Sequence, residues 1–207
     1  MKIEKTDPGK KPRLAAAFTL VETMVVMALV TILLGLAANG MKTTWRSQQI
    51  AASAAGLMQA FSLAQSTAIR NNAPIQVRIY KFQDGDLTTT DPQFRAWQIT
   101  GVNAAAQGDQ FYQISELQRF ESTIVMSKFP EYSSVVSGET VLMPGDDKYS
   151  YVAIEFRPDG STNLETNPNQ PWTITLLSDW GSDDKSKLPK DARTLIISPD
   201  TGAVSLY

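Results

Sequence analysis

One ionisable side chain lies within an otherwise apolar stretch of this sequence, and it is the residue best placed to do chemistry. Glu22 is the single charged residue between positions 18 and 38, where three threonines are the other polar residues. A charge at the centre of a membrane span costs about 2.5–3.5 kcal/mol on insertion scales. A segment that served only as an anchor would not need this carboxylate, so its presence predicts a specific role.

Composition narrows the other kinds of chemistry. The 207-residue chain has no Cys and no His, which excludes disulfides, thiolate or imidazole metal ligands and a Ser-His-Asp triad. Asp179, Asp183 and Asp184 offer the oxygen ligands that calcium prefers. Two lysines, Lys185 and Lys187, follow directly and the EF-hand spacing is missing, so we expect a solvated loop. Carboxylate or Ser-Lys chemistry is not excluded by composition, but the sequence shows no constellation of residues for it. We therefore expect no enzyme activity, no cofactor and no metal site.

A basic leader precedes the apolar stretch. Residues 1–17 carry five basic and two acidic side chains, whereas the rest of the chain carries 14 basic and 19 acidic ones. The apolar stretch 18–38 has about the 20 residues that a membrane-spanning helix needs. Positive charge just before a span predicts a cytoplasmic N-terminus with the acidic remainder outside. That acidic balance gives no electrostatic reason to bind nucleic acid.

The position of the small residue separates the possible kinds of N-terminal signal. An ordinary secretory signal has a shorter apolar core, with the small-residue cleavage site after that core. Here Ala17 stands before the apolar stretch, and a late site in the Ala-Ala-Asn-Gly of residues 37–40 would require an unusually long core. A plain signal anchor with a chance carboxylate is the other alternative.

Residues 17–22, which read Ala-Phe-Thr-Leu-Val-Glu, resemble the processing signal of type IV prepilins and type II secretion pseudopilins. Those proteins typically have Gly where this chain has Ala17. The resemblance implies that prepilin peptidase cleaves the Ala17–Phe18 bond and N-methylates Phe18. Glu22 can then pair with the new α-ammonium, in its own chain or in a neighbour, where the pairing would set axial register. A passive carboxylate near the membrane surface is the alternative.

A single helix is expected from Phe18 to about Asn71, because no Pro occurs between Arg13 and Pro74. Beyond residue 38 an apolar stripe repeats at helical steps of three and four. This outer half should therefore pack one face on a domain. The stripe consists of Ile50, Ala54, Leu57, Phe61, Ala64 and Ala68.

After the helix the hydrophobic pattern changes to the period of two that is typical of strands. Ile75, Val77 and Ile79 alternate with polar neighbours, and turn signals such as the Pro-Asp-Gly of 158–160 separate further runs. Those runs are 95–102, 111–116, 135–143, 149–156, 172–177, 194–198 and 203–207. Because strands follow one another without helices between them, we expect an antiparallel sheet. The predicted fold class is α+β, a long N-terminal helix packed on a β-rich domain.

Three tryptophans are candidate binding aromatics. Trp97 and Trp172 lie in strand-like runs, where packing in the core is the commoner role. Trp180 lies in the loop that holds the aspartates. We expect the first two to belong to the core.

A second resemblance narrows the family. Segments 57–72, 154–161 and 195–204 are similar to the GspH/FimT group of minor pilins and pseudopilins, and to prepilin-type proteins called Verru_Chthon cassette protein D. This similarity implies the pilin fold with a β-sandwich-like domain. The chain departs from the group after Gly202, where no basic residue follows, and this argues against DNA capture of the FimT kind. It also reads Ala-Gln-Ser-Thr-Ala at 64–68 in place of Ala-Arg-Ser-Glu-Ala, which should affect only a surface pair.

These observations predict a minor pseudopilin or minor pilin, a structural subunit and not an enzyme. The expected organisation is a leader (1–17), a membrane and assembly helix (18–38), an amphipathic outer helix (39–72) and a β-rich globular domain (73–207). The resemblance implies prepilin peptidase and other pilins as partners, in a type II secretion pseudopilus or type IV pilus-like fibre. It also implies a single pass through a bacterial inner membrane, with the globular domain periplasmic or extracellular. The alternatives are a FimT-like pilin for DNA uptake and a membrane-anchored binding domain outside a fibre.

Overall fold

The computed structural model describes residues 19–83, 91–103, 110–143, 146–167, 170–179 and 188–207. The predicted cleavage residues Ala17 and Phe18 lie outside the described residues, as do Trp180 and the loop aspartates Asp183 and Asp184. The chain divides into two compact units, Met1–Thr43 and Thr44–Tyr207. Helix α1 (Leu20–Asn71) contributes residues to both units.

Helix α1 ends where the sequence predicted, and its last turn explains why. Asn72 has a φ of 48°, the left-handed conformation that often follows a helix. The N–H of Asn72 donates to Ile69 O, and the N–H of Ala73 donates to Ala68 O. This Schellman arrangement satisfies the last carbonyl groups of the helix, and Pro74 follows directly.

The predicted apolar stripe faces the core of the second unit. All six of its residues are 0% exposed, and they belong to one hydrophobic cluster with residues of the sheet. The rings of Phe61 and Phe156 lie with their centroids 6.0 Å apart. Ser53 and Thr67 are buried beside the stripe, and Ser53 Oγ accepts the backbone N–H of Glu121 at 3.3 Å. The helical periodicity thus predicted the packed face correctly.

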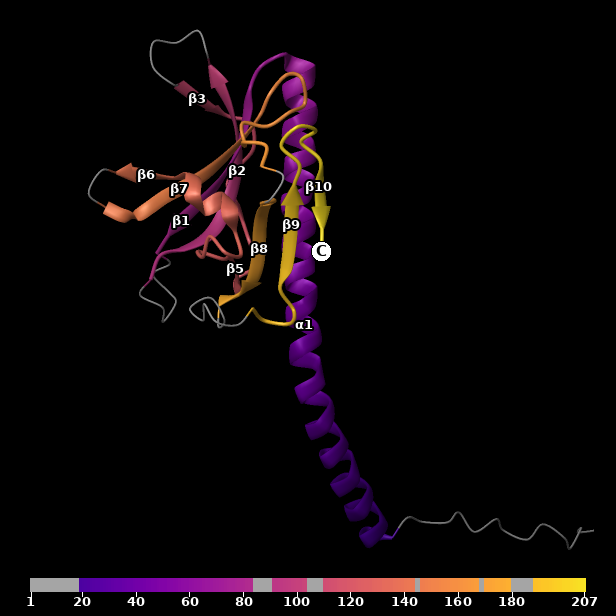
Figure 1. Ribbon diagram of the computed structural model, residues 1–207. Coiled ribbons are helices and arrows are strands. Elements are labelled where there is room, and N and C mark those ends of the chain that lie inside the picture. The colour runs from indigo at the N-terminus through magenta and orange to yellow at the C-terminus, as the bar shows by residue number, and fades with distance from the viewer. Residues whose placement is uncertain (1–18, 84–90, 104–109, 144–145, 168–169, 180–187) are drawn as a thin grey trace, which may run out of the picture. The chain divides into compact units, whose positions relative to one another are not determined.

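Within the described residues, ten strands form one antiparallel sheet (Figure 1). Its order is β10-β9-β8-β5-β2-β1-β7-β6, and β3 and β4 also pair with β2. The strands are β1 (Ile75–Phe82), β2 (Gln93–Asn103), β3 (Gln110–Gln113), β4 (Gln118–Arg119), β5 (Ile124–Met126), β6 (Glu139–Met143), β7 (Asp146–Phe156), β8 (Trp172–Ser178), β9 (Arg193–Ile197) and β10 (Val204–Leu206). We expected a β-sandwich-like domain, and the structure has a single hydrogen-bonded sheet. Strand β5 joins its two halves, because Met126 pairs with Phe94 of β2 on one side and with Leu176 of β8 on the other.

The strand predicted at 135–143 is partly wrong. Its first part is a 3₁₀ helix, η1 (Ser134–Gly138), and only β6 is a strand. Ser134 accounts for the difference, because its N–H donates to Thr173 Oγ1 and its Oγ donates to Pro171 O, both at 3.1 Å. These bonds hold the segment against the start of β8 in place of strand pairing.

The region around β3 also differs from the prediction. Strand β3 ends three residues before the predicted end at 116, because the N–H groups of Ile114 and Ser115 both donate to Ile99 O. Strands β4 and β5 were not predicted. With two and three residues, they are too short for an alternating pattern to identify them.

Asp179 does not belong to a solvated loop. Its carboxylate Oδ2 lies 2.9 Å from Arg95 Nη2, and the two side chains are 11% and 7% exposed. The partners are 84 residues apart in the chain, so the local sequence gave no sign of the pair. Loss of either partner would break this buried ion pair, a change that is strongly destabilising in proteins.

The Pro-Asp-Gly turn is confirmed. Gly160 has a φ of 86°, which glycine adopts without steric cost, and its N–H donates to Arg157 O at 2.9 Å. Asp159 Oδ1 accepts two hydrogen bonds from Ser161, one from the side-chain hydroxyl at 2.7 Å and one from the backbone N–H at 2.9 Å. These bonds hold the pKa of the Asp159 carboxyl below its ordinary value.

Gln65 anchors α1 to two turns, so the expectation that position 65 affects only a surface pair was wrong. Its Nε2 donates to Gly160 O at 2.8 Å and to Thr201 O at 2.6 Å. Gly202, the residue after Thr201 in the second of these turns, has a φ of 64°. A Cβ atom at this position would collide with Gly160 O. The second turn therefore requires glycine both for its conformation and for space.

We expect Gln65→Ala to lower the free energy of unfolding of the 44–207 unit by about 1–3 kcal/mol, because two carbonyl groups lose their donor. Gln59→Ala is the matched control, since Gln59 is exposed on the same helix, and we expect a change within about 0.5 kcal/mol. Urea unfolding followed by circular dichroism measures both. Equal midpoints for the two variants would contradict the anchoring role.

Candidate assembly site at the start of the helix

The first turn of α1 fixes the position of Glu22. Thr19 Oγ1 accepts the backbone N–H of Glu22 at 3.2 Å, and Thr19 O accepts the N–H of Thr23 at 3.2 Å. Thr19 is thus the N-cap, with Thr and Glu spaced as in a capping box. The positive end of the helix dipole also favours a carboxylate in this turn. This role of Thr19 was not predicted, although the Thr-x-x-Glu spacing could have revealed it.

The carboxylate of Glu22 is exposed and, among the described residues, has no hydrogen bond or ion pair. The threonine hydroxyl groups of the same helix, in contrast to this carboxylate, hydrogen-bond to backbone carbonyl groups of the helix. Thr23 Oγ1 donates to Leu20 O, and Thr31 Oγ1 donates to Met27 O, both at 2.8 Å. Such bonds to the preceding turn let threonine lie in apolar surroundings. The Glu22 carboxylate makes no such bond to the preceding turn in the described part of the chain.

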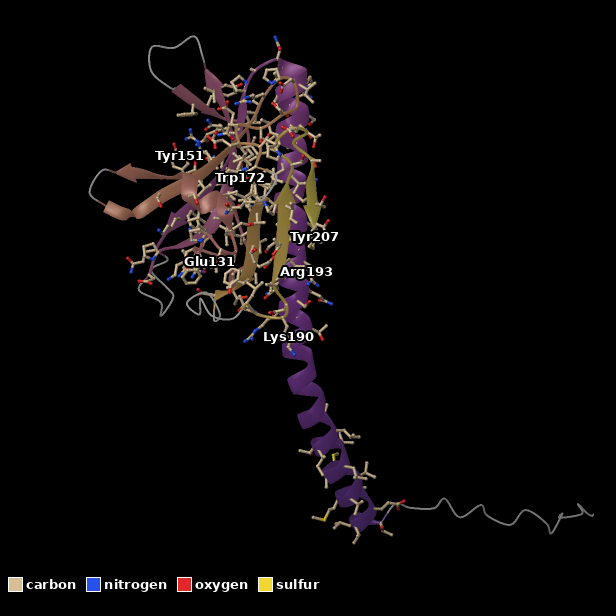
Figure 2. All side chains as sticks on the ribbon, in the orientation of Figure 1. Glu131, Tyr151, Trp172, Lys190, Arg193 and Tyr207 are labelled. Atoms are coloured by element: carbon tan, nitrogen blue, oxygen red, sulfur yellow. The ribbon has the colours of Figure 1, made fainter. Side chains whose placement is uncertain are left out.

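The helix around Glu22 exposes apolar side chains on every side (Figure 2). The four consecutive residues 24–27 are separated by about 100° each around the helix, and they are 51–69% exposed. The exposed large apolar residues here are Leu20, Val21, Met24, Val25, Val26, Met27, Leu29, Val30, Ile32, Leu33 and Leu34. A helix that is apolar all round is suited to surroundings that are themselves apolar.

Neither a membrane-spanning helix nor a metal-binding group of side chains is found in the described part of the chain. No helix there combines the length and the apolarity that crossing a membrane would require. Among the same residues, no group of three or more acidic side chains is arranged to hold a metal ion.

The N-terminal sequence identifies a class, that of prepilin-type proteins. The prokaryotic N-terminal methylation motif matches residues 12–38. The type II transport protein GspH family matches residues 53–201, well over half of the chain, and the chain belongs to this family. This confirms the resemblance to minor pilins and pseudopilins, which are structural proteins. No curated protein sequence matches the chain.

Solved structures similar to this chain include those of two other proteins. One is the type IV minor pilin FimU of Pseudomonas aeruginosa, with 15% identity and a TM-score of 0.46, covering 77% of this chain and 89% of FimU. The other is the minor pseudopilin EpsH from the type 2 secretion system of Vibrio cholerae, with 14% identity and a TM-score of 0.43, covering 77% and 96%.

Proposed function

We propose that this protein is a minor subunit of a type II secretion pseudopilus or a type IV pilus-like fibre, assembled through the first part of α1. The observation that carries the proposal is Glu22, a carboxylate without a partner among the described residues, in the first turn of a helix whose large exposed residues are apolar. The methylation motif that spans this segment supports it. Neighbouring helices of the same kind would cover the apolar surface.

Processing creates the group that Glu22 requires. Prepilin peptidase cleaves the Ala17–Phe18 bond and N-methylates Phe18, which leaves a cationic terminus at the start of the helix. In apolar surroundings an unpaired carboxylate is costly, and pairing it with this cation offsets the cost for both groups. Pairing between neighbouring subunits would also set their axial register.

The proposal includes a location in the inner membrane, which the methylation motif over residues 12–38 supports. Basic residues of the leader hold the N-terminus in the cytoplasm, residues 18–38 span the bilayer, and the 44–207 unit lies on the periplasmic or extracellular side. The acidic balance after residue 17 disfavours nucleic acid as a partner. Prepilin peptidase and other pilins are the proposed partners.

The position of cleavage tests the proposal. Mass spectrometry of protein extracted from membranes with active prepilin peptidase should find N-methyl-Phe18 as the first residue. Ala17→Glu should block processing without preventing insertion, because the apolar stretch is unchanged. Ala17→Gly, which restores the residue usual in prepilins, is the matched control and should be processed at least as fast. An intact leader on the unsubstituted chain would overturn the proposal.

A further inference from the structure

A hollow lies beside Trp172 on the 44–207 unit. Its main cavity has a volume of ≈ 360 Å³, and a smaller one of ≈ 100 Å³ shares Ser137 and Trp172 with it. The main cavity is lined by η1, β7, the segment 163–165 and the start of β8. Its volume lies at the lower end of the roughly 300–1,000 Å³ that is usual for ligand pockets.

Trp172 is held in a fixed orientation in this wall. Its indole Nε1 donates to Glu165 O at 2.7 Å, and the ring is partly buried against the core; the residue is labelled in Figure 2. The bond uses the single donor of the indole, so the ring offers a ligand only its π face and its carbon edge. Trp172 thus packs on the core, as predicted, and also lines the hollow.

The rest of the lining combines an apolar floor with a polar rim whose one ionisable side chain, among the described residues, is that of Glu165. Val152 and Ile154 are buried at the floor. Among the described residues, no Lys or Arg lines either cavity. The exposed polar side chains of the rim are Ser137, Asn163, Glu165, Asn167 and Gln170. Together they present hydroxyl, amide and carboxylate groups.

We propose that this hollow binds an uncharged saccharide. A sugar ring has an apolar face of C–H groups, which fits an indole, and hydroxyl groups that both donate and accept, which fit amides and a carboxylate. A phosphorylated or acidic ligand would meet Glu165 and, in the described lining, no cation. This inference does not depend on assembly into a fibre.

Strand addition by a peptide fits the hollow less well. The backbone N–H of Glu155 on β7 already donates to Asn163 Oδ1 at 2.9 Å, and the N–H of Thr173 on β8 donates to Ser134 Oγ at 2.8 Å. A peptide strand binds through unpaired backbone groups at a sheet edge. Side chains occupy these two groups next to the hollow.

Calorimetric titration of the full chain, in a detergent without a sugar headgroup, tests the proposal with cellotriose, triacetylchitotriose and digalacturonate. We expect at least one of the two uncharged sugars to bind, to shift the nuclear magnetic resonance signal of the Trp172 indole N–H, and to bind more tightly than the acidic one. Trp172→Ala should weaken that binding by about tenfold, the upper range for an aromatic contact. Trp45→Ala is the matched control, because Trp45 is 64% exposed on α1 and lines neither cavity.

A second variant covers the case in which Trp172→Ala does not fold. Ser137 is exposed and lines both cavities, so Ser137→Phe should fill the hollow and abolish binding while the circular dichroism spectrum stays the same. The proposal is overturned if neither uncharged sugar binds, if binding survives Ser137→Phe, or if the acidic sugar binds most tightly.

Discussion

Glu22→Leu should give a protein that is processed and held in the membrane but no longer crosslinks to other pilins. Insertion becomes easier, because a charge costing about 2.5–3.5 kcal/mol at a span centre, and less near its end, is removed. Cleavage should persist, since Ala17 and Phe18 are unchanged. Assembly should fail or weaken because the cationic terminus loses its partner. Site-specific crosslinking from the first part of α1 measures the outcome.

The helix start itself should survive this substitution. Thr19 Oγ1 bonds the backbone N–H of residue 22, and that group is present with any side chain except proline. Glu22→Gln is the matched control for charge, because it keeps the size and polarity of the side chain and should also lose crosslinking. The crosslinking yield should be measured on this protein itself, since the loss of a minor subunit can go unnoticed when whole fibres are counted. Unchanged crosslinking in Glu22→Leu would show that Glu22 is a passive residue near the membrane surface.

Phe61→Ala should lower the free energy of unfolding of the 44–207 unit by about 3–5 kcal/mol, the usual range for a fully buried Phe. Phe61 is 0% exposed, and its ring packs on Phe156 from the far end of β7. The substitution therefore leaves a cavity between helix and sheet. A loss of this size is a large part of the total stability of a typical domain.

Urea unfolding of the fragment 44–207, followed by circular dichroism, measures this loss. Leu63→Ala is the matched control, because Leu63 is 50% exposed on the same helix and should change stability by less than about 1 kcal/mol. A fragment that is unfolded or mainly helical would contradict the fold. Similar losses for Phe61→Ala and Leu63→Ala would contradict the placement of Phe61 at the centre of the core.

The sequence by itself determined the elements that depend on short-range periodicity. Steps of three and four residues identified the buried stripe from Ile50 to Ala68, because one face of a helix recurs at that spacing. Alternation identified β1 and most of the longer strands, and Pro74 indicated where α1 stops. The motif at residues 17–22 indicated a prepilin-type protein, and the segments 57–72, 154–161 and 195–204 indicated the GspH/FimT group. The spacing of Thr19 and Glu22 is that of an N-cap, although the N-cap was not predicted.

Only the tertiary structure decided which distant segments meet. Gln65 bonds carbonyl groups 95 and 136 residues away, and Arg95 pairs with Asp179 across 84 residues, so no local pattern could reveal either contact. The same holds for Ser134, whose bonds to β8 turn an expected strand into η1. Alternation in the sequence predicted correctly that Trp172 packs on the core, because periodicity indicates which side of a strand is buried. It could not predict the hollow beside Trp172, because distant segments of the chain form that hollow only after folding.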